Sequence, residues 1–193
     1  MSTVGDTGVR AEILALDRGG LARRMREGHP IDAHALDDQA YRGISLGLPV
    51  WFESLAWKTF QKTFHRDPAT GHLRGWNVRV RQQGLDAPSV PMQRKGAPVT
   101  FGHYRVVSCE GRDVPRGAGA GLLIDYGLGG NTAMDPMRWL CDPLVALLPG
   151  SVRWLLGWSY LQIAGLRIGT PSYFLLECEH ALTHRVPPPR PAR

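Results

Sequence analysis

The chain has 193 residues, and its 23 Lys and Arg against 17 Asp and Glu give a formal net charge of +6. This length allows one domain with a sizeable core, and a hydrophobic content of 43% is ordinary for a globular protein. The basic residues are scattered in small clusters without the signature of a nucleic-acid-binding module, so we expect no nucleic-acid partner.

Targeting and cofactor signals are absent from the sequence. The N-terminus contains acidic residues and lacks the apolar run of a signal peptide, and no stretch of about 18 apolar residues occurs. We therefore expect a cytoplasmic protein without stable membrane insertion. The cysteines Cys109, Cys141 and Cys178 are widely spaced without metal-ligand spacing, and no phosphate-binding loop or hydrolase elbow occurs. We predict free thiols, no metal and no cofactor.

The N-terminal third is predicted to be helical. Residues 1–10 are rich in Gly, Ser and Thr and are expected to be disordered. The apolar residues between Ala11 and Glu27 have helix-compatible spacing, interrupted by Gly19 and Gly20. Pro49 suits the first turn of a further helix. We expect short helices within residues 11–56, before the main β domain.

A β-hairpin is predicted next. Apolar and polar residues alternate after Trp57, and the sequence Asp-Pro-Ala-Thr-Gly at 67–71 has the residues of a chain reversal. A competing interpretation places Phe52, Ala56, Phe60 and Phe64 on one helical face, but the turn, together with Thr59 and Thr63, favours strand after Ala56. In the second strand we predict that Trp76, Val78 and Val80 face inward, whereas the alternating Asn77, Arg79 and Arg81 face solvent.

Short apolar runs broken by Gly and Pro continue to the C-terminus. Strands are predicted at 99–109 and 121–126, and the last third contains further runs around a turn at Pro149 and Gly150. Such spacing indicates a mainly β protein, an antiparallel β-barrel of seven or eight strands formed within residues 11–185. The proline-rich residues 186–193 are expected to form a disordered, extended tail.

Three short segments resemble an uncharacterised bacterial family named for a G-x-W-x-G motif, together with its companion domain of unknown function, considered lipocalin-like. They are Tyr41-Arg42-Gly43, residues 53–64, and the pair 155–160 and 173–177. Tyr41 replaces a tryptophan of the family, and Thr59 occupies or adjoins its glycine. The resemblance covers about a third of the chain and implies a lipocalin-like barrel, but it carries over no catalytic residue.

Aromatic and hydroxyl side chains on the expected strands are the candidate ligand site. An eight-stranded barrel is just wide enough to be filled by its own side chains or to hold one small apolar ligand. Core packing predicts the same residues, and the sequence leaves both readings open. The candidates are Trp76, Tyr104, Tyr126, Trp158, Tyr160 and Phe174.

A second group could act as a general acid or base inside a dry cavity. His103 is followed by Tyr104, and Asp125 by Tyr126, on strands expected to lie close together. Because neighbouring strand residues point to opposite faces, only one of each pair can point inward. His29, His65 and His72 lie in or beside turns, where histidines are usually solvated.

These residues support three hypotheses. The first is a binding protein for a hydrophobic or amphipathic small molecule. The second is a cyclase or isomerase acting on a polyketide-like or terpenoid-like substrate, with Asp125, Tyr126 or His103 transferring a proton. The third is an assembly protein that uses its arginines and proline-rich tail. A homodimer is left open, because Trp139 and Trp154 could form a dimer surface or touch a membrane edge, although packing over the barrel is simpler.

Overall fold

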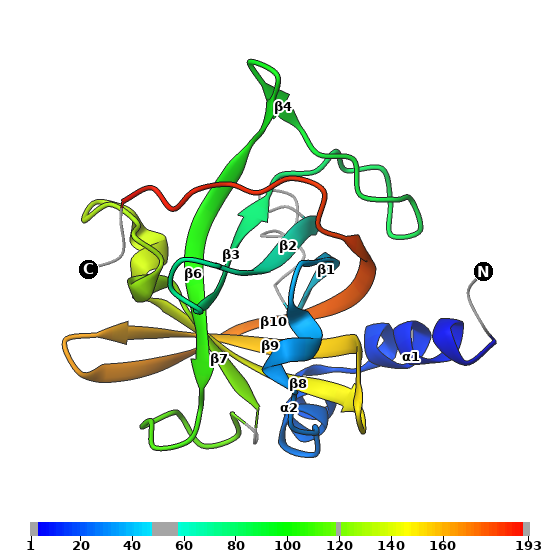
Figure 1. Ribbon diagram of the computed structural model, residues 1–193. Helices are drawn as coiled ribbons and strands as arrows, with labels where there is room; N and C mark the ends of the chain where they lie inside the picture. The colour runs from blue at the N-terminus through cyan, green and yellow to red at the C-terminus, as the bar shows by residue number, and fades with distance from the viewer. Residues whose placement is uncertain (1–3, 48–57, 119–120, 191–193) are drawn as a thin grey trace.

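Eight antiparallel strands close into a barrel in the computed structural model, which describes residues 4–47, 58–118 and 121–190 (Figure 1). Neighbouring strands follow one another along the chain, and the pairing of the first with the last closes the barrel. The strands are β1 (Gln39–Leu46), β2 (Thr59–Arg66), β3 (Leu73–Val78), β6 (Thr100–Ser108), β7 (Leu122–Asp125), β8 (Leu140–Leu148), β9 (Ser151–Ile163) and β10 (Leu166–Ala181). The mainly β barrel predicted from the sequence is thus confirmed.

The connections carry the remaining elements. β4 (Gln93–Arg94) and β5 (Ala97–Pro98) form a separate two-stranded ribbon between β3 and β6. Three short 3-10 helices are η1 (Ala33–Leu36), η2 (Tyr126–Leu128) and η3 (Pro136–Trp139). Residues 166–169 pair with β9 as the start of β10.

The hairpin predicted at residues 67–71 joins β2 to β3. The Asp67 side chain accepts a hydrogen bond from the Ala69 amide, and the Asp67 carbonyl accepts one from the Gly71 amide. Gly71 has a φ of 71°, a left-handed conformation that glycine adopts without steric cost. Local turn chemistry therefore determines this reversal, as the sequence indicates.

Two helices cover part of the outer barrel surface. They are α1 (Val4–Ala15) and α2 (Arg18–Arg26), and the Asp17 carboxylate caps α2 by accepting from the Gly20 amide. Ile13, Leu21 and Met25 are buried against the outer sides of β8, β9 and β10. Val9 packs against the same cluster and Arg10 pairs with Glu177, so part of the segment expected to be disordered belongs to α1.

The expected helical region also contains a strand. β1 lies inside residues 11–56, where the sequence analysis expected helices. The helix predicted at Pro49 lies outside the described residues.

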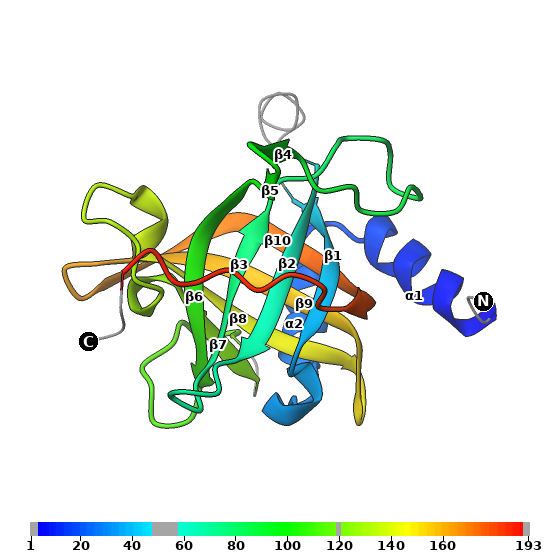
Figure 2. The ribbon, with the colours of Figure 1, turned by 45° about the horizontal axis from the view of Figure 1, so that its top comes forward.

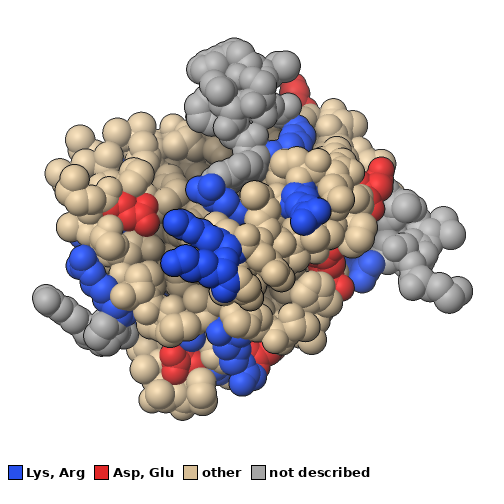
Figure 3. Space-filling model, turned by 90° about the horizontal axis from the view of Figure 1, so that it is seen from above, with Lys and Arg blue, Asp and Glu red and all other residues tan. Residues whose placement is uncertain are grey.

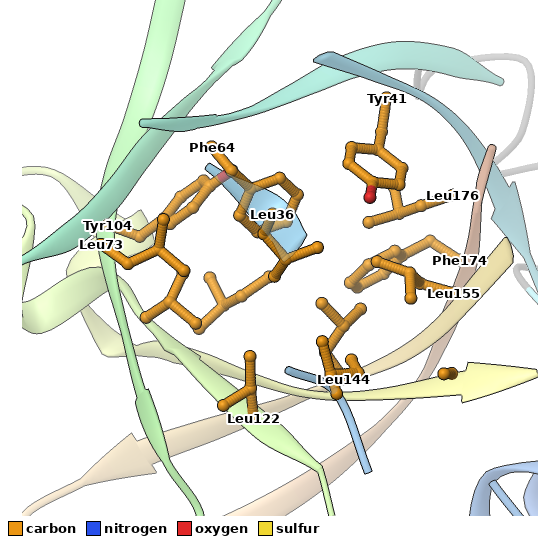
Figure 4. Packing of buried hydrophobic residues seen from close by; sticks show 14 of the residues in the cluster. Leu36, Tyr41, Phe64, Leu73, Tyr104, Leu122, Leu144, Leu155, Phe174 and Leu176 are labelled. Atoms are coloured by element: carbon orange, nitrogen blue, oxygen red, sulfur yellow. The ribbon is translucent and has the colours of Figure 1, made fainter. Parts of the chain in front are cut away.

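Apolar side chains pack the barrel interior (Figure 4), and we call the end that holds Leu36, Phe64, Leu73 and Leu122 the closed end. η1 brings Leu36 into this end, where it is fully buried beside Phe64. Gly75 provides room for the Tyr104 ring, because a Cβ on Gly75 would lie 2.6 Å from that ring. Every strand of the barrel contributes to this cluster, whose members include Tyr41, Leu73, Leu122, Leu144, Leu155 and Leu176.

The C-terminal segment, residues 182–190, runs across the outer faces of β2, β3 and β6 (Figures 1 and 2). The Leu182 amide donates to the Asp38 carbonyl, and the Arg74 guanidinium donates to the Val186 carbonyl. Viewed from above, several basic side chains gather near the middle of the molecular surface (Figure 3). The described part of the proline-rich tail is therefore held against the barrel by hydrogen bonds.

Candidate functional site

The opposite end of the barrel interior, which we call the open end, contains a cluster of three ionisable side chains. Lys62 on β2 donates a hydrogen bond from Nζ to the Tyr126 hydroxyl, at 2.7 Å. Tyr126 in turn donates to Oδ2 of Asp142 on β8, at 3.0 Å. The Lys62 Nζ lies 3.5 Å from the same carboxylate oxygen. Lys62 and Asp142 are only 1% and 2% exposed, so the three groups form a buried polar network.

Strand alternation brings these side chains together. Phe60, Lys62 and Phe64 share the inward face of β2, with the lysine between the two rings. Tyr126 is the first residue of η2, and the preceding Asp125 caps η2 by accepting from the amides of Gly127 and Leu128. That cap turns the chain at the end of β7 and leaves Tyr126 buried inside the barrel.

Four aromatic rings surround the Lys62 amine. The Nζ atom lies 4.6 Å from the ring centroid of Tyr104, 5.0 Å from that of Phe174 and 5.1 Å from that of Tyr126. The Phe60 centroid is 6.0 Å away. Ring faces at such distances stabilise a cation. This stabilisation is much smaller than the hydration free energy that the ammonium group loses when it leaves bulk water.

Burial controls the acid–base behaviour of the network. It lowers the pKa of Lys62 to about 8, although the neighbouring Asp142 carboxylate favours the ammonium form. Burial raises the pKa of Asp142, against the opposing effect of the Lys62 charge. It also raises the pKa of Tyr126 well above its usual value. Oδ1 of Asp142 is buried without a hydrogen-bond partner among the described residues.

A pocket of about 190 Å³ reaches this network. Its apolar wall includes Phe60, Met137, Leu140 and Phe174, and hydroxyl and amide groups line other parts. The Asn77 amide nitrogen donates to the Gly102 carbonyl at 3.1 Å and lies 3.4 Å from the Tyr126 oxygen. The remaining lining residues are Ser45, Lys62, Phe101, Tyr126, Asp142, Ser159 and Ser172.

Three of the six predicted ligand-site residues belong to this interior. Tyr126 and Phe174 line the pocket, and Tyr104 packs against Tyr126 with ring centroids 5.4 Å apart. The Tyr104 hydroxyl donates to the Thr63 carbonyl at 2.6 Å, which turns it toward the closed end. Core packing and pocket lining are thus both represented among the predicted aromatic residues.

The structure places the other three outside the barrel, which corrects the sequence assignment. Trp158 stacks on Tyr173 and packs beside the α-helices, and Tyr160 is buried on the outer face with Leu123 and Cys141. Trp76 is also buried outside, in a pocket shared with the C-terminal Thr183 and His184. Helices cover Trp158, the tail covers Trp76, and apolar neighbours on the outer face bury Tyr160. An apolar position in the alternating sequence pattern therefore does not identify the inner face.

β3 shows this reversal most clearly. Its inward residues are Leu73, Gly75 and Asn77, whereas Trp76 and Val78 face outward. Asn77 was expected to face solvent, but it is 2% exposed and bonded inside the barrel.

The predicted acid–base residues are separated by the barrel wall. Tyr126 is inside, but Asp125 caps η2 on the outside, 4.0 Å from Arg112. His103 also faces outward, into a pocket of about 120 Å³ that includes Arg74 and Arg105. Burial and then the Arg74 charge lower the pKa of His103 to about 4. His103 and Asp125 therefore cannot act with Tyr126 on one molecule in the barrel.

Two residues of the network were missed by the sequence analysis. The signal for Lys62 is its position two residues from both Phe60 and Phe64, because strand alternation places all three side chains on the same face. Asp142 was visible as an acid within the apolar run at 140–148. His65, expected to be solvated, is also buried and pairs with Asp38.

The described residues contain no group of three or more His, Cys, Asp or Glu placed to hold a metal ion. Cys109, Cys141 and Cys178 are free thiols. No helix in the described ranges is both long enough and apolar enough to cross a membrane.

Fold and site together define an eight-stranded antiparallel barrel with a buried Lys–Tyr–Asp network beside an interior pocket. In comparisons with protein-family models, curated proteins and solved structures, nothing matches this chain. The resemblance to the G-x-W-x-G family accordingly stays a prediction.

Proposed function

We propose that this protein binds a small amphipathic molecule in the open end of the barrel. The observation that carries the proposal is the pocket of about 190 Å³, which combines an apolar wall with the network of Lys62, Tyr126 and Asp142. Apolar walls with a few placed polar groups are typical of small-molecule sites, because the walls provide affinity and the polar groups orient the ligand.

The pocket volume favours a ligand about the size of one substituted ring. An apolar cavity of about 150 Å³ accepts benzene, whereas drug-sized ligands occupy about 300 to 1,000 Å³. The ring would lie against Phe60, Met137 and Leu140, with its polar group near Lys62 and Ser172. Polyketide-like or terpenoid-like molecules with several fused rings exceed this volume.

Ligand binding can be tested with benzyl alcohol as the probe. We expect it to raise the thermal unfolding temperature and to perturb NMR signals of Phe60 and Leu140, because binding to the folded state stabilises that state. Ser172→Leu should abolish both effects by filling the pocket. Ser108→Leu, at an exposed position toward the opposite end of the barrel, is the matched control and should preserve them.

No shift with benzyl alcohol or with other single-ring alcohols and ketones would overturn the binding proposal. An equal shift in the Ser172→Leu variant would overturn the assigned location.

A second candidate function is proton transfer on a bound carbonyl compound, as in an isomerase. It is favoured by Asp142, a buried carboxylate of the pocket lining whose Oδ1 is not bonded to Lys62 or Tyr126. The role predicted for Asp125 or His103 would then belong to Asp142, with Tyr126 as its neighbour. Exchange of the α-hydrogens of cyclohexanone in D₂O tests this function. Exchange no faster than in buffer, or unchanged in Asp142→Asn, would exclude it.

A further inference from the structure

Lys62 differs from the other lysines of the chain in its surroundings. Only Lys58, Lys62 and Lys95 are lysines among the 23 basic residues. Lys95 is exposed in the β4–β5 turn and Lys58 is partly buried, whereas Lys62 is 1% exposed. Arginine remains charged under all ordinary conditions, but lysine can lose its proton and become a nucleophile. The basic residue inside the barrel, Lys62, is therefore one whose amine can act as a nucleophile and form a covalent bond.

Stability alone gives no reason for this lysine. A buried ion pair loses solvation that its Coulomb attraction only partly replaces, and well-packed apolar residues often stabilise a core equally or better. Phe60 and Phe64 flank Lys62 on the same strand face, so apolar residues are accommodated on both sides of it. The position of Lys62 in a pocket wall points instead to a use of its amine.

We propose that Lys62 forms a reversible imine with an aldehyde or ketone bound in the pocket. This inference rests on the proposed ligand-binding function and names the ligand class. The geometry carries it: Lys62 lines a pocket of about 190 Å³, four rings surround its Nζ, and Tyr126 and Asp142 lie within 3.5 Å of Nζ along a hydrogen-bonded chain.

The network provides a route for the protons. The Lys62 ammonium passes a proton to the Tyr126 oxygen as Tyr126 passes its own to Asp142, leaving a neutral amine, a phenol and a carboxylic acid. The direction of the Asp142 pKa, raised by burial, favours this neutral arrangement. At pH 7, a pKa of about 8 leaves about a tenth of Lys62 as free amine, against about one part in three thousand for the usual 10.5.

The chemical steps balance without a further reactant. The Nζ lone pair forms a C–N bond to the carbonyl carbon, and the carbonyl oxygen takes up a proton while the nitrogen loses one. The network then protonates the carbinolamine hydroxyl, which leaves as water while the nitrogen lone pair forms the C=N bond, and the remaining N–H proton returns to the network. The products are the Lys62 imine and one water molecule, so hydrolysis reverses the reaction.

Reductive trapping tests the proposal on the wild-type chain. The protein is treated at pH 7 with benzaldehyde and sodium cyanoborohydride, digested and mapped by mass spectrometry. We expect one benzyl group on Lys62, exceeding the labelling of Lys58 and Lys95 by about tenfold or more, because more of its amine is neutral. Excess cyclohexanone should reduce the labelling of Lys62 and leave that of Lys95 unchanged.

The outcomes separate this proposal from ligand binding. Labelling of Lys62 no greater than that of Lys95 would overturn the imine. If benzyl alcohol still shifted the unfolding temperature, the binding proposal would stand without the imine. Absence of both labelling and shift would overturn both. In Lys62→Arg the site label should disappear while Lys95 is still labelled, and persistence of the label in that peptide would also contradict the assignment.

Discussion

The two ends of the barrel interior use the same strands but satisfy their polar groups differently. At the closed end, tyrosine hydroxyls donate to backbone carbonyls: Tyr41 to Val152, and Tyr104 to Thr63. At the open end, Lys62, Tyr126 and Asp142 bond to one another. Backbone partners are part of the fold, whereas a side-chain network can exchange protons or partners. This difference supports the proposal that the closed end contributes mainly to stability, whereas the open end binds a ligand.

The largest expected effect tests this contrast with two phenylalanines of β2. Phe64 is fully buried at the closed end, with its ring centroid 5.3 Å from that of Tyr41, whereas Phe60 is partly buried beside the pocket. Phe64→Ala should reduce the free energy of unfolding by about 3 to 5 kcal/mol. Phe60→Ala should cost about 1 to 2 kcal/mol, because a pocket already borders it. Urea unfolding measures both, and equal losses would remove the distinction between the two ends.

The next effect concerns the buried charges. Asp142→Leu leaves the Lys62 ammonium without its carboxylate, and should destabilise the protein by about 3 kcal/mol. The double variant Lys62→Met with Asp142→Leu removes both charges and should recover most of that loss. The unfolding free energies of the two single variants and the double variant give the coupling free energy between Lys62 and Asp142. Additive losses would mean that the two side chains do not act as a pair.

A pH titration examines the same lysine without removing it. Because the folded pKa of Lys62 is lowered to about 8 from 10.5, the unfolded chain binds more protons between these values. The Lys62 contribution to the unfolding free energy therefore rises with pH across this window, by about 1 to 3 kcal/mol. We expect the rise to exceed that in Lys62→Met. Parallel pH profiles of the two proteins would contradict the lowered pKa.

The sequence predicted the architecture better than the site because different forces determine the two. The 67–71 hairpin follows from local turn residues, and the run of strands from period-two alternation. Alternation identifies two faces but not which is inner. Trp76 and Tyr160 are buried, as core residues would be, but both lie on the outer face of the barrel. The C-terminal tail covers Trp76, and neighbouring apolar side chains cover Tyr160. Lys62 and Asp142 are far apart in sequence, so only barrel closure pairs them.

The smallest expected effect separates the Tyr126 hydroxyl from its ring. Tyr126→Phe keeps the ring that packs on Tyr104 and removes the hydroxyl between Lys62 and Asp142. The stability loss should be about 1 kcal/mol, because the direct contact between the two charges remains. Labelling of Lys62 by benzaldehyde should fall clearly even though the loss of stability is small, because the proton route through the hydroxyl is broken. Unchanged labelling would show that Lys62 exchanges its proton without Tyr126, and the open end would then be a binding pocket with a reactive lysine but no proton relay.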